Sequence, residues 1–267
     1  MTKKKSFVGA TIFDGFKRHL NSALIINNNK VVEIIAEEKI DPETEQIVLA
    51  GGLITPGFVD LQVNGGGGVL FNDNPSLENL KTICEAHAKL GSTSIMPTLI
   101  SDSPELNKQA ISAITNALDQ QVNGLIGLHL EGPHLALARK GAHKEDFIRP
   151  MKEFDCLELE SVANKVPNLM LTIAPEAVSP EQITRLSNAG AIISLGHTDC
   201  TFNQAAEAVD AGATCATHLF NAMSPFGSRE PGLVGAVLNN GKLFSGIIAD
   251  GFHVIKISIN LALRAKK

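Results

Sequence analysis

Apolar and polar positions are arranged in two different ways along the chain, and the arrangement changes near residue 54. Before that point, short β-rich runs are separated by turn residues. In "SALIINNNKVVEII" an Asn cluster divides two such runs, which predicts a β-hairpin. "EQIVLAGGLI" predicts a further strand. We therefore expect residues 1–53 to form a small β domain.

From residue 54 onwards, nearly unbroken apolar runs alternate with stretches of helical period. Such a pattern is typical of a parallel sheet covered by helices. Ser101 or Ser103 can cap a helix with Pro104 in its first turn, and Gly91 and Gly212 suit positions just beyond helix ends. Seven strands are expected, in "LITPGFVDLQV", "STSIMPTLI", "GLIGLHLEG", "NLMLTIAPE", "AIISLGHT", "ATCATHLF" and "LFSGIIADG".

All but one of these predicted strands end in charged, imidazole or amide side chains. A (β/α)₈ barrel brings the C-terminal ends of its strands to one mouth, where its active site lies. A doubly wound sheet would instead gather such groups at a single switch point. The pattern favours a TIM-type (β/α)₈ barrel over residues 54–267, with seven of its eight strands in this chain. The strand-end residues are Asp60, Gln62, Asn64, Glu131, His134, Glu176, His197, His218, Asn221, Asp250 and His253.

Three of these residues suggest a metal site. His197 and His218 are one βα unit apart, hence on adjacent strands, and Glu131 lies two strands earlier. Two imidazoles and one carboxylate around an open position are typical of catalytic zinc-type sites, which lower the pKa of water and supply a hydroxide nucleophile. Each residue alone has a plainer interpretation, since a histidine at a strand end is often structural and a glutamate can cap a helix. Their coincidence favours one divalent metal ion, with Zn²⁺, Fe²⁺ and Co²⁺ all acceptable.

Composition and charge indicate which kinds of molecule the protein can bind. The net charge of −5 argues against a broad nucleic-acid surface, although a compact phosphate site needs only a few donors. The four cysteines are scattered without a CxxC pair, as in reduced cytoplasmic proteins. No stretch reaches membrane-spanning length or forms the apolar core of a leader. We expect a cytoplasmic protein that binds neither nucleic acid nor membrane.

Several blocks resemble, in order, those of the amidohydrolase superfamily and, within it, the N-acetylglucosamine-6-phosphate deacetylases. They include "PGFVDLQVNGGGGVLFND", "GLHLEGPHL", "KGAH", "LGHTD", "THLFNAM", "REPGLVGAVL" and "IIADGFHV". The resemblance implies metal-dependent hydrolysis of N-acetylglucosamine 6-phosphate to glucosamine 6-phosphate and acetate. Most superfamily members have His-x-His where this chain has Gln62 and Asn64. Because neutral amides are poor ligands for such ions, the resemblance implies a single metal held by Glu131, His197 and His218.

The resemblance also assigns substrate contacts. It implies that His143 polarises the acetamide carbonyl or binds the sugar, and that Gln62 lines the pocket. His253 would contact sugar hydroxyls or phosphate, and the N–H groups at Asn221 and Ala222 would bind the phosphate. The phosphate cation would be Arg229, reaching across the interface of a homodimer. A lone arginine in a loop is otherwise more often a solvated surface charge.

Family members also possess an eighth strand with an aspartate that transfers a proton to the leaving amine, and further strands of the β domain. No such block follows His253. We therefore expect a truncated chain with open sheet edges that favour aggregation. We also expect reduced turnover, since acid–base help is worth about 10²–10⁴-fold. Two alternatives stay open: a different amidohydrolase acting on a cyclic or linear amide, against which "DLQVN" speaks, and a non-catalytic protein that binds amino-sugar phosphates.

Overall fold

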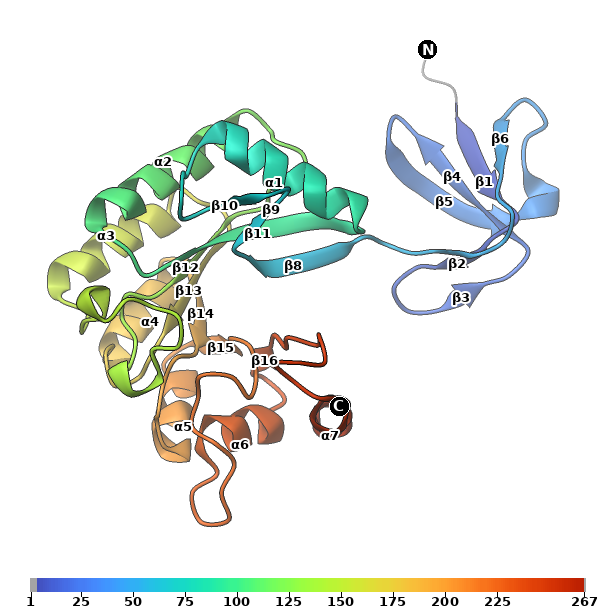
Figure 1. The fold of residues 1–267 in the computed structure, drawn as a ribbon. Coiled ribbons are helices and arrows are strands. Elements are labelled where there is room, and N and C mark those ends of the chain that lie inside the picture. The colour runs from blue at the N-terminus through green and yellow to red at the C-terminus, as the bar shows by residue number, and fades with distance from the viewer. Residues whose placement is uncertain (1–3, 267) are drawn as a thin grey trace. The chain divides into compact units, whose positions relative to one another are not determined.

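The computed structural model describes residues 4–266, and the chain divides into two compact units with the boundary between Phe58 and Val59 (Figure 1). The first unit therefore extends a few residues beyond position 53. It does so because β7 (Leu53–Ile54) pairs in parallel with β2 (Thr11–Phe13) and so belongs to the sheets of this unit. Within the described residues, no helix combines the length and the apolar composition needed to cross a bilayer.

The first unit consists of two small sheets, with strand orders β5-β4-β1-β6 and β3-β2-β7. The expected hairpin is confirmed: Asn27 pairs with Lys30 across a two-residue turn. Asn28 and Asn29 have φ values of 51° and 59°, the left-handed pair that a type I′ turn requires and that Asn tolerates. The remaining elements are β1 (Lys5–Val8), β3 (Arg18–His19), β4 (Ser22–Asn27), β5 (Lys30–Ala36), the 3₁₀ turn η1 (Glu37–Lys39) and β6 (Glu45–Val48).

The second unit contains a seven-stranded sheet of order β16-β15-β14-β13-β12-β11-β8, which curves into part of a barrel with helices along its outer face (Figure 1). Each strand from β11 to β16 pairs in parallel with the next. The predicted fold class and the seven strands are confirmed. The strands are β8 (Phe58–Val63), β11 (Ser92–Ile100), β12 (Leu128–Glu131), β13 (Leu169–Ile173), β14 (Ile192–Leu195), β15 (Ala213–Ala216) and β16 (Phe244–Ser245), with a small hairpin of β9 (Gly65–Gly66) and β10 (Val69–Leu70).

Helix ends follow the local sequence. The hydroxyl of Ser103, rather than that of Ser101, accepts the Leu106 N–H and caps the helix that Pro104 begins. Gly91 and Gly212 follow their helix ends with φ values of 98° and 121°, as C′ glycines do. The helices are α1 (Leu77–Lys89), α2 (Pro104–Asp119), α3 (Glu153–Ala163), α4 (Pro180–Asn188), α5 (Phe202–Asp210), α6 (Gly232–Asn239) and α7 (Lys256–Ala265), with 3₁₀ turns η2 (Leu137–Arg139) and η3 (Glu145–Phe147).

The sheet is open between β8 and β16, which end the strand order. Every residue of the central strand β13 is buried, because helices cover one of its faces and the barrel interior the other. Towards the open side, apolar side chains are exposed instead: Val59 is 60% exposed and Phe244 69%. This uncovered apolar surface is what an incomplete ring of strands predicts.

Candidate metal centre

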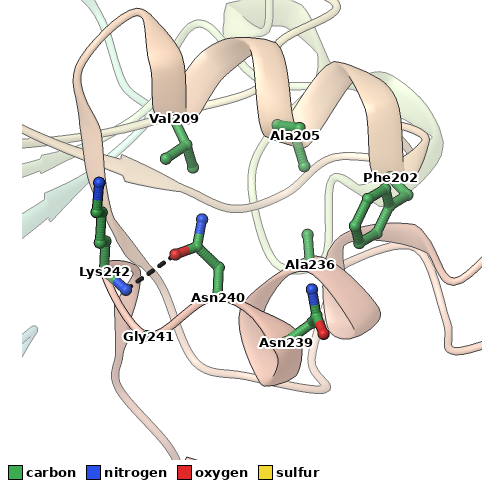
Figure 2. A pocket seen from close by; sticks show the side chains of 9 residues that line it. Phe202, Ala205, Val209, Ala236, Asn239, Asn240, Gly241 and Lys242 are labelled. Atoms are coloured by element: carbon green, nitrogen blue, oxygen red, sulfur yellow. Dashed lines mark hydrogen bonds between the residues drawn. The ribbon is translucent and has the colours of Figure 1, made fainter.

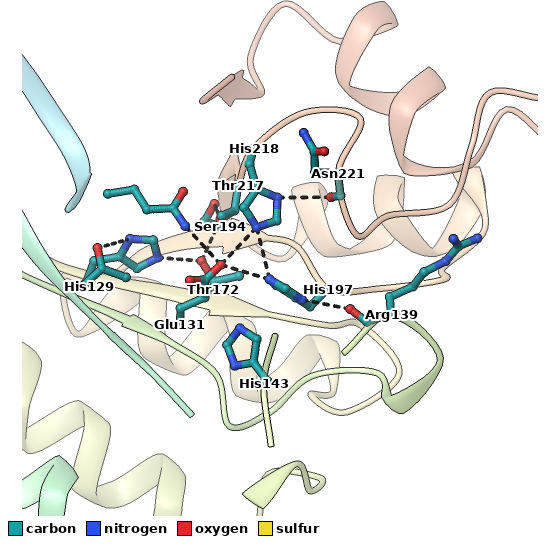
Figure 3. A network of polar contacts seen from close by, with 12 residues as sticks. His129, Glu131, Arg139, His143, Thr172, Ser194, His197, Thr217, His218 and Asn221 are labelled. Atoms are coloured by element: carbon teal, nitrogen blue, oxygen red, sulfur yellow. Dashed lines mark hydrogen bonds and ion pairs between the residues drawn. The ribbon is translucent and has the colours of Figure 1, made fainter. Parts of the chain in front are cut away.

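Glu131, His197 and His218 converge at the C-terminal ends of the strands (Figure 3). Glu131 ends β12, and the two histidines follow β14 and β15. Each Nε2 lies 3.0 Å from Oε1 of Glu131, and the two Nε2 atoms are 3.1 Å apart. All three side chains are buried. Residues separated by up to 87 positions therefore meet at one point.

The other ring nitrogen of each histidine identifies the tautomer. Nδ1 of His197 lies 2.8 Å from the carbonyl oxygen of Arg139, and Nδ1 of His218 lies 3.1 Å from that of Asn221. Since a carbonyl oxygen only accepts, each Nδ1 donates. In the neutral rings both Nε2 atoms then hold lone pairs that face the carboxylate.

This donor set fits a divalent cation. Two nitrogen lone pairs and a carboxylate oxygen within 3.1 Å of one another repel, and a proton can relieve only one pair of them. Ligand atoms around a tetrahedral zinc-type ion are roughly 3.3 Å apart, close to the observed spacing. A backbone carbonyl bonded to the far nitrogen is also the usual partner of a metal-binding histidine.

Glu131 is prepared as an anion. Burial alone would raise the pKa of Glu131, but His197 and His218, whose Nε2 atoms donate to the carboxylate whenever they carry a proton, hold the pKa well below its usual range. The amide of Gln62, on β8, donates to Oε1 over 3.1 Å. Gln62 therefore lies next to Glu131, and this hydrogen bond restrains the position of the carboxylate.

His143 lies beside this group with the opposite tautomer. The Ser101 N–H donates to its Nδ1 over 3.2 Å, so the proton of the neutral ring is on Nε2. The rings of His143 and His197 are 4.4 Å apart, and Glu131, His143 and His197 offer ligand atoms within 4.8 Å of one another. Burial, reinforced by the nearby His197, lowers the pKa of His143 to about 4. His143 is therefore a neutral N–H donor near pH 7.

The remaining predicted substrate residues are less closely gathered. The Asn221 N–H donates to the His218 carbonyl over 2.9 Å, so it is already engaged inside the loop. Arg229 is exposed in the segment between β15 and α6. His253 is also exposed, and its Nδ1 pairs with Asp250 over 2.6 Å. Among the described contacts, none brings Arg229 or His253 to the Glu131 group.

A cavity of 670 Å³ opens beside Glu131 inside the half-barrel. Asp60, Gln62, Asn64 and His218 line it. Buried His129, Ser194 and Thr217 also line it. Thr172 connects them in a series of hydrogen bonds of 2.6 to 2.7 Å (Figure 3). Four of the strand-end polar residues thus line a space large enough for a sugar-sized ligand.

A second hollow, of 390 Å³, lies between α5 and α6 (Figure 2). Phe202, Ala205, Val209 and Ala236 give it a mainly apolar lining. The Lys242 backbone N–H at its rim donates to the Asn240 side chain over 2.9 Å. The lining contains none of the predicted site residues, so this hollow is not part of the candidate centre.

Sequence reasoning missed the residues that orient the imidazoles. Ser101 was considered only as a helix cap, yet it follows β11 and fixes the His143 tautomer. Arg139 contributes through its carbonyl, for which no side-chain pattern exists. Ser101 could have been found, because it is the polar residue that ends the one strand without an assigned group.

Comparison with known proteins assigns the chain to a family. A family model described as "Amidohydrolase family" matches residues 53–267. The chain belongs to the amidohydrolase family. This family implies a divalent metal ion, which agrees with the fit of the donor set described above.

Relatives of this amidohydrolase are sugar-phosphate deacetylases. It is 45% identical over 218 residues to the N-acetylgalactosamine-6-phosphate deacetylase of Shewanella sp. (strain ANA-3), covering 82% of this chain and 55% of that protein. It is 39% identical over 256 residues to the N-acetylglucosamine-6-phosphate deacetylase of Haemophilus influenzae, covering 94% of this chain and 65% of that one. The chain thus spans a little over half to about two thirds of the length of these relatives.

A solved structure shares the fold throughout. The crystal structure of N-acetylglucosamine-6-phosphate deacetylase from Pasteurella multocida matches with a TM-score of 0.94 and 37% sequence identity. The match covers 98% of this amidohydrolase and 69% of that chain. The similarity therefore includes both units and the strand ends that hold the metal-binding candidates.

Proposed function

We propose that this amidohydrolase removes the acetyl group of N-acetylglucosamine 6-phosphate, forming glucosamine 6-phosphate and acetate. The observation that supports this most is the pair of imidazole lone pairs and the carboxylate oxygen that face one another beside a neutral N–H donor. The names of the relatives supply the substrate class. No step is assigned to the apolar hollow between α5 and α6.

Glu131, His197 and His218 would hold one metal ion, for which we propose Zn²⁺ because two imidazoles and one carboxylate with an open position suit it. Such an ion supplies Lewis acidity towards a carbonyl and a lowered pKa for water. The chain's part is to present two neutral rings through the carbonyls of Arg139 and Asn221. The Gln62 amide limits rotation of the carboxylate.

His143 would bind the acetamide oxygen. Its Nε2–H points away from the Nδ1 that Ser101 occupies, and a neutral donor aimed at an oxygen that gains negative charge stabilises the transition state more than the ground state. Since its pKa is about 4, the ring keeps this neutral form across the physiological range.

Phosphate binding is proposed for the other predicted residues. Ala222 N–H, Arg229 and His253 would surround the phosphate in a cytoplasmic homodimer, with Arg229 contributed by the neighbouring subunit. Support comes from the exposure of Arg229, which leaves its guanidinium available. Mixing inactive Arg229→Ala and His197→Ala proteins should then restore about a quarter of the activity, because half of the random dimers regain one intact site. No recovery would argue against sharing across an interface.

A second substrate is favoured by one observation. The 45% identical relative is named for N-acetylgalactosamine 6-phosphate, the epimer at a single sugar carbon. Both compounds present the same acetamide and phosphate, so the metal centre would treat them alike. Any preference would come from contacts to one hydroxyl.

The test combines metal analysis with acetate release from both sugar phosphates. We expect about one metal ion per chain, and loss of both metal and activity in His197→Ala and His218→Ala. His19→Ala, in the first unit, is the matched control because His19 pairs with Asp14 far from this site in the sequence. Metal retained by both site variants, or acetate release that a chelator leaves unchanged, would contradict the proposal.

A further inference from the structure

The loops that carry His197 and His218 have an unusual backbone. His197, His218, Phe220 and Ala222 have φ values of 48°, 37°, 80° and 48°. Side chains with a Cβ disfavour this left-handed region. Such conformations persist only where surrounding contacts hold them, so these two loops need an identifiable restraint.

Thr198 joins the two loops directly beyond His197. It is fully buried. Its N–H donates to the Ala222 carbonyl over 3.2 Å, and its own carbonyl accepts the Ser224 N–H over 3.0 Å. Thr198 and Met223 thereby form an isolated parallel bridge. The bridge ties the segment after His197 to the segment after His218.

Glu176 holds this bridge from the end of β13. One carboxylate oxygen accepts the Thr198 hydroxyl over 2.5 Å, and the other accepts the Asp199 N–H over 2.7 Å. Asp199 in turn pairs with the Arg139 guanidinium at 2.7 Å, and the Arg139 carbonyl accepts Nδ1–H of His197. Glu176 therefore restrains Thr198 and Asp199 directly, and Arg139 indirectly through the Asp199 carboxylate.

We propose that Glu176 and Thr198 are positioning residues that hold the two histidine loops so that both Nε2 atoms face Glu131. This inference rests on the metal centre of the proposed function. Their described contacts are with backbone and side chains next to the histidines, not with the three ligand atoms. Removing them lets the left-handed residues relax, and the rings then lose their shared direction. The metal affinity should fall while the buried sheet beneath keeps its packing.

The test measures the Zn²⁺ dissociation constant by competition with a chelator, and the Tm with and without saturating Zn²⁺. Thr198→Val and Glu176→Ala should weaken Zn²⁺ binding by about 10–100-fold, the usual effect of losing a partner that orients ligands. Thr198→Ser keeps the hydroxyl and should stay close to the unsubstituted protein. Glu181→Ala is the matched control, since it removes an exposed carboxylate from the first turn of α4.

Equal Zn²⁺ affinity in all these proteins would overturn the inference. So would equal falls in Tm for the metal-free and metal-loaded forms, because a merely structural role lowers both alike. If the unsubstituted protein binds no Zn²⁺, the proposed function fails by itself. Long-range ¹H–¹⁵N spectra of the imidazoles then decide the inference: Thr198→Val should change the His197 and His218 tautomers, and unchanged spectra would refute it.

Discussion

At the scale of single residues, the three clustered histidines differ in the partner of one nitrogen. His197 and His218 each donate Nδ1–H to a carbonyl, which leaves Nε2 free as a ligand. His143 accepts a backbone N–H at Nδ1, which leaves Nε2–H as a donor. The same side chain is thus prepared for two kinds of chemistry by the groups around its Nδ1: backbone carbonyls in His197 and His218, and the N–H and hydroxyl of Ser101 in His143.

His143→Ala should separate these roles. We expect the variant to keep its metal, because the proposed ligands are untouched, and to lose about 10²–10³-fold in kcat, as the removal of one oxyanion donor does. Metal content and kcat are measured on the same preparation. Loss of the metal together with activity would place His143 among the ligands instead.

At the scale of elements, the long segment between β12 and α3 carries His143, and hydrogen bonds join the two ends of this segment. His134 donates Nδ1–H to the Arg149 carbonyl over 3.1 Å, and Arg149 N–H donates back to the Pro133 carbonyl over 3.1 Å. The Arg149 guanidinium donates from two nitrogens to the carboxylate of Asp155 in α3. These contacts fix where the segment leaves and rejoins the barrel, and hence where His143 can lie.

Stability should depend on pH through His134. Burial lowers the pKa of His134 below its usual 6.5, although the bond to the Arg149 carbonyl opposes the shift. As the pH falls below 6.5, the unfolded chain therefore binds a proton before the folded chain does. Stability is complete above that pH and decreases below it, by up to about 1.4 kcal/mol per pH unit for one proton.

Urea unfolding between about pH 7.5 and pH 5 measures this effect. Other buried histidines add to the slope, so His134→Gln should make the curve shallower rather than flat. Asp155 affects stability only in a more acidic range. Burial raises the pKa of its carboxyl, but the hydrogen bonds from Arg149 outweigh burial and keep the pKa below 3.8. An unchanged slope in His134→Gln would show that this group does not contribute.

At the scale of the whole molecule, the open side of the half-barrel determines behaviour in solution. The exposed apolar side chains lie on the edge strands β8 and β16, and on α7, where Ile257 is 68% exposed and Leu261 56%. Exposed apolar side chains favour association, and an unpaired strand edge offers a second route to it.

We expect this 267-residue chain to self-associate in a concentration-dependent manner. Ile257→Lys combined with Leu261→Lys should shift the population towards smaller species, because the two side chains are one turn apart on α7 and both lose their apolar character. Leu90→Lys, at a leucine that is 80% exposed at the end of α1, is the control. Sedimentation analysis measures the effect, and a monomer at all concentrations would contradict it.

Much of the fold could be predicted from the sequence. Strands and helices appear as expected because hydrophobic period and capping residues act locally, as at Ser103, Gly91 and the Asn28–Asn29 turn. Glu131, His197 and His218 could be grouped because parallel strands bring their C-terminal ends to one rim. Both inferences need only the order of residues along the sequence and the geometry of a parallel sheet.

Tertiary structure alone decided how those groups face one another. The tautomers depend on the carbonyls of Arg139 and Asn221 and on the Ser101 N–H, none of which a side-chain pattern reveals. Glu176 was recognised as a strand-end carboxylate, but its bond to Thr198 depends on loop geometry. His253 was expected near the site and lies exposed beside Asp250. Hydrogen bonds between segments far apart in the sequence determine loop conformation, so the chain order predicts which groups approach but not their orientation.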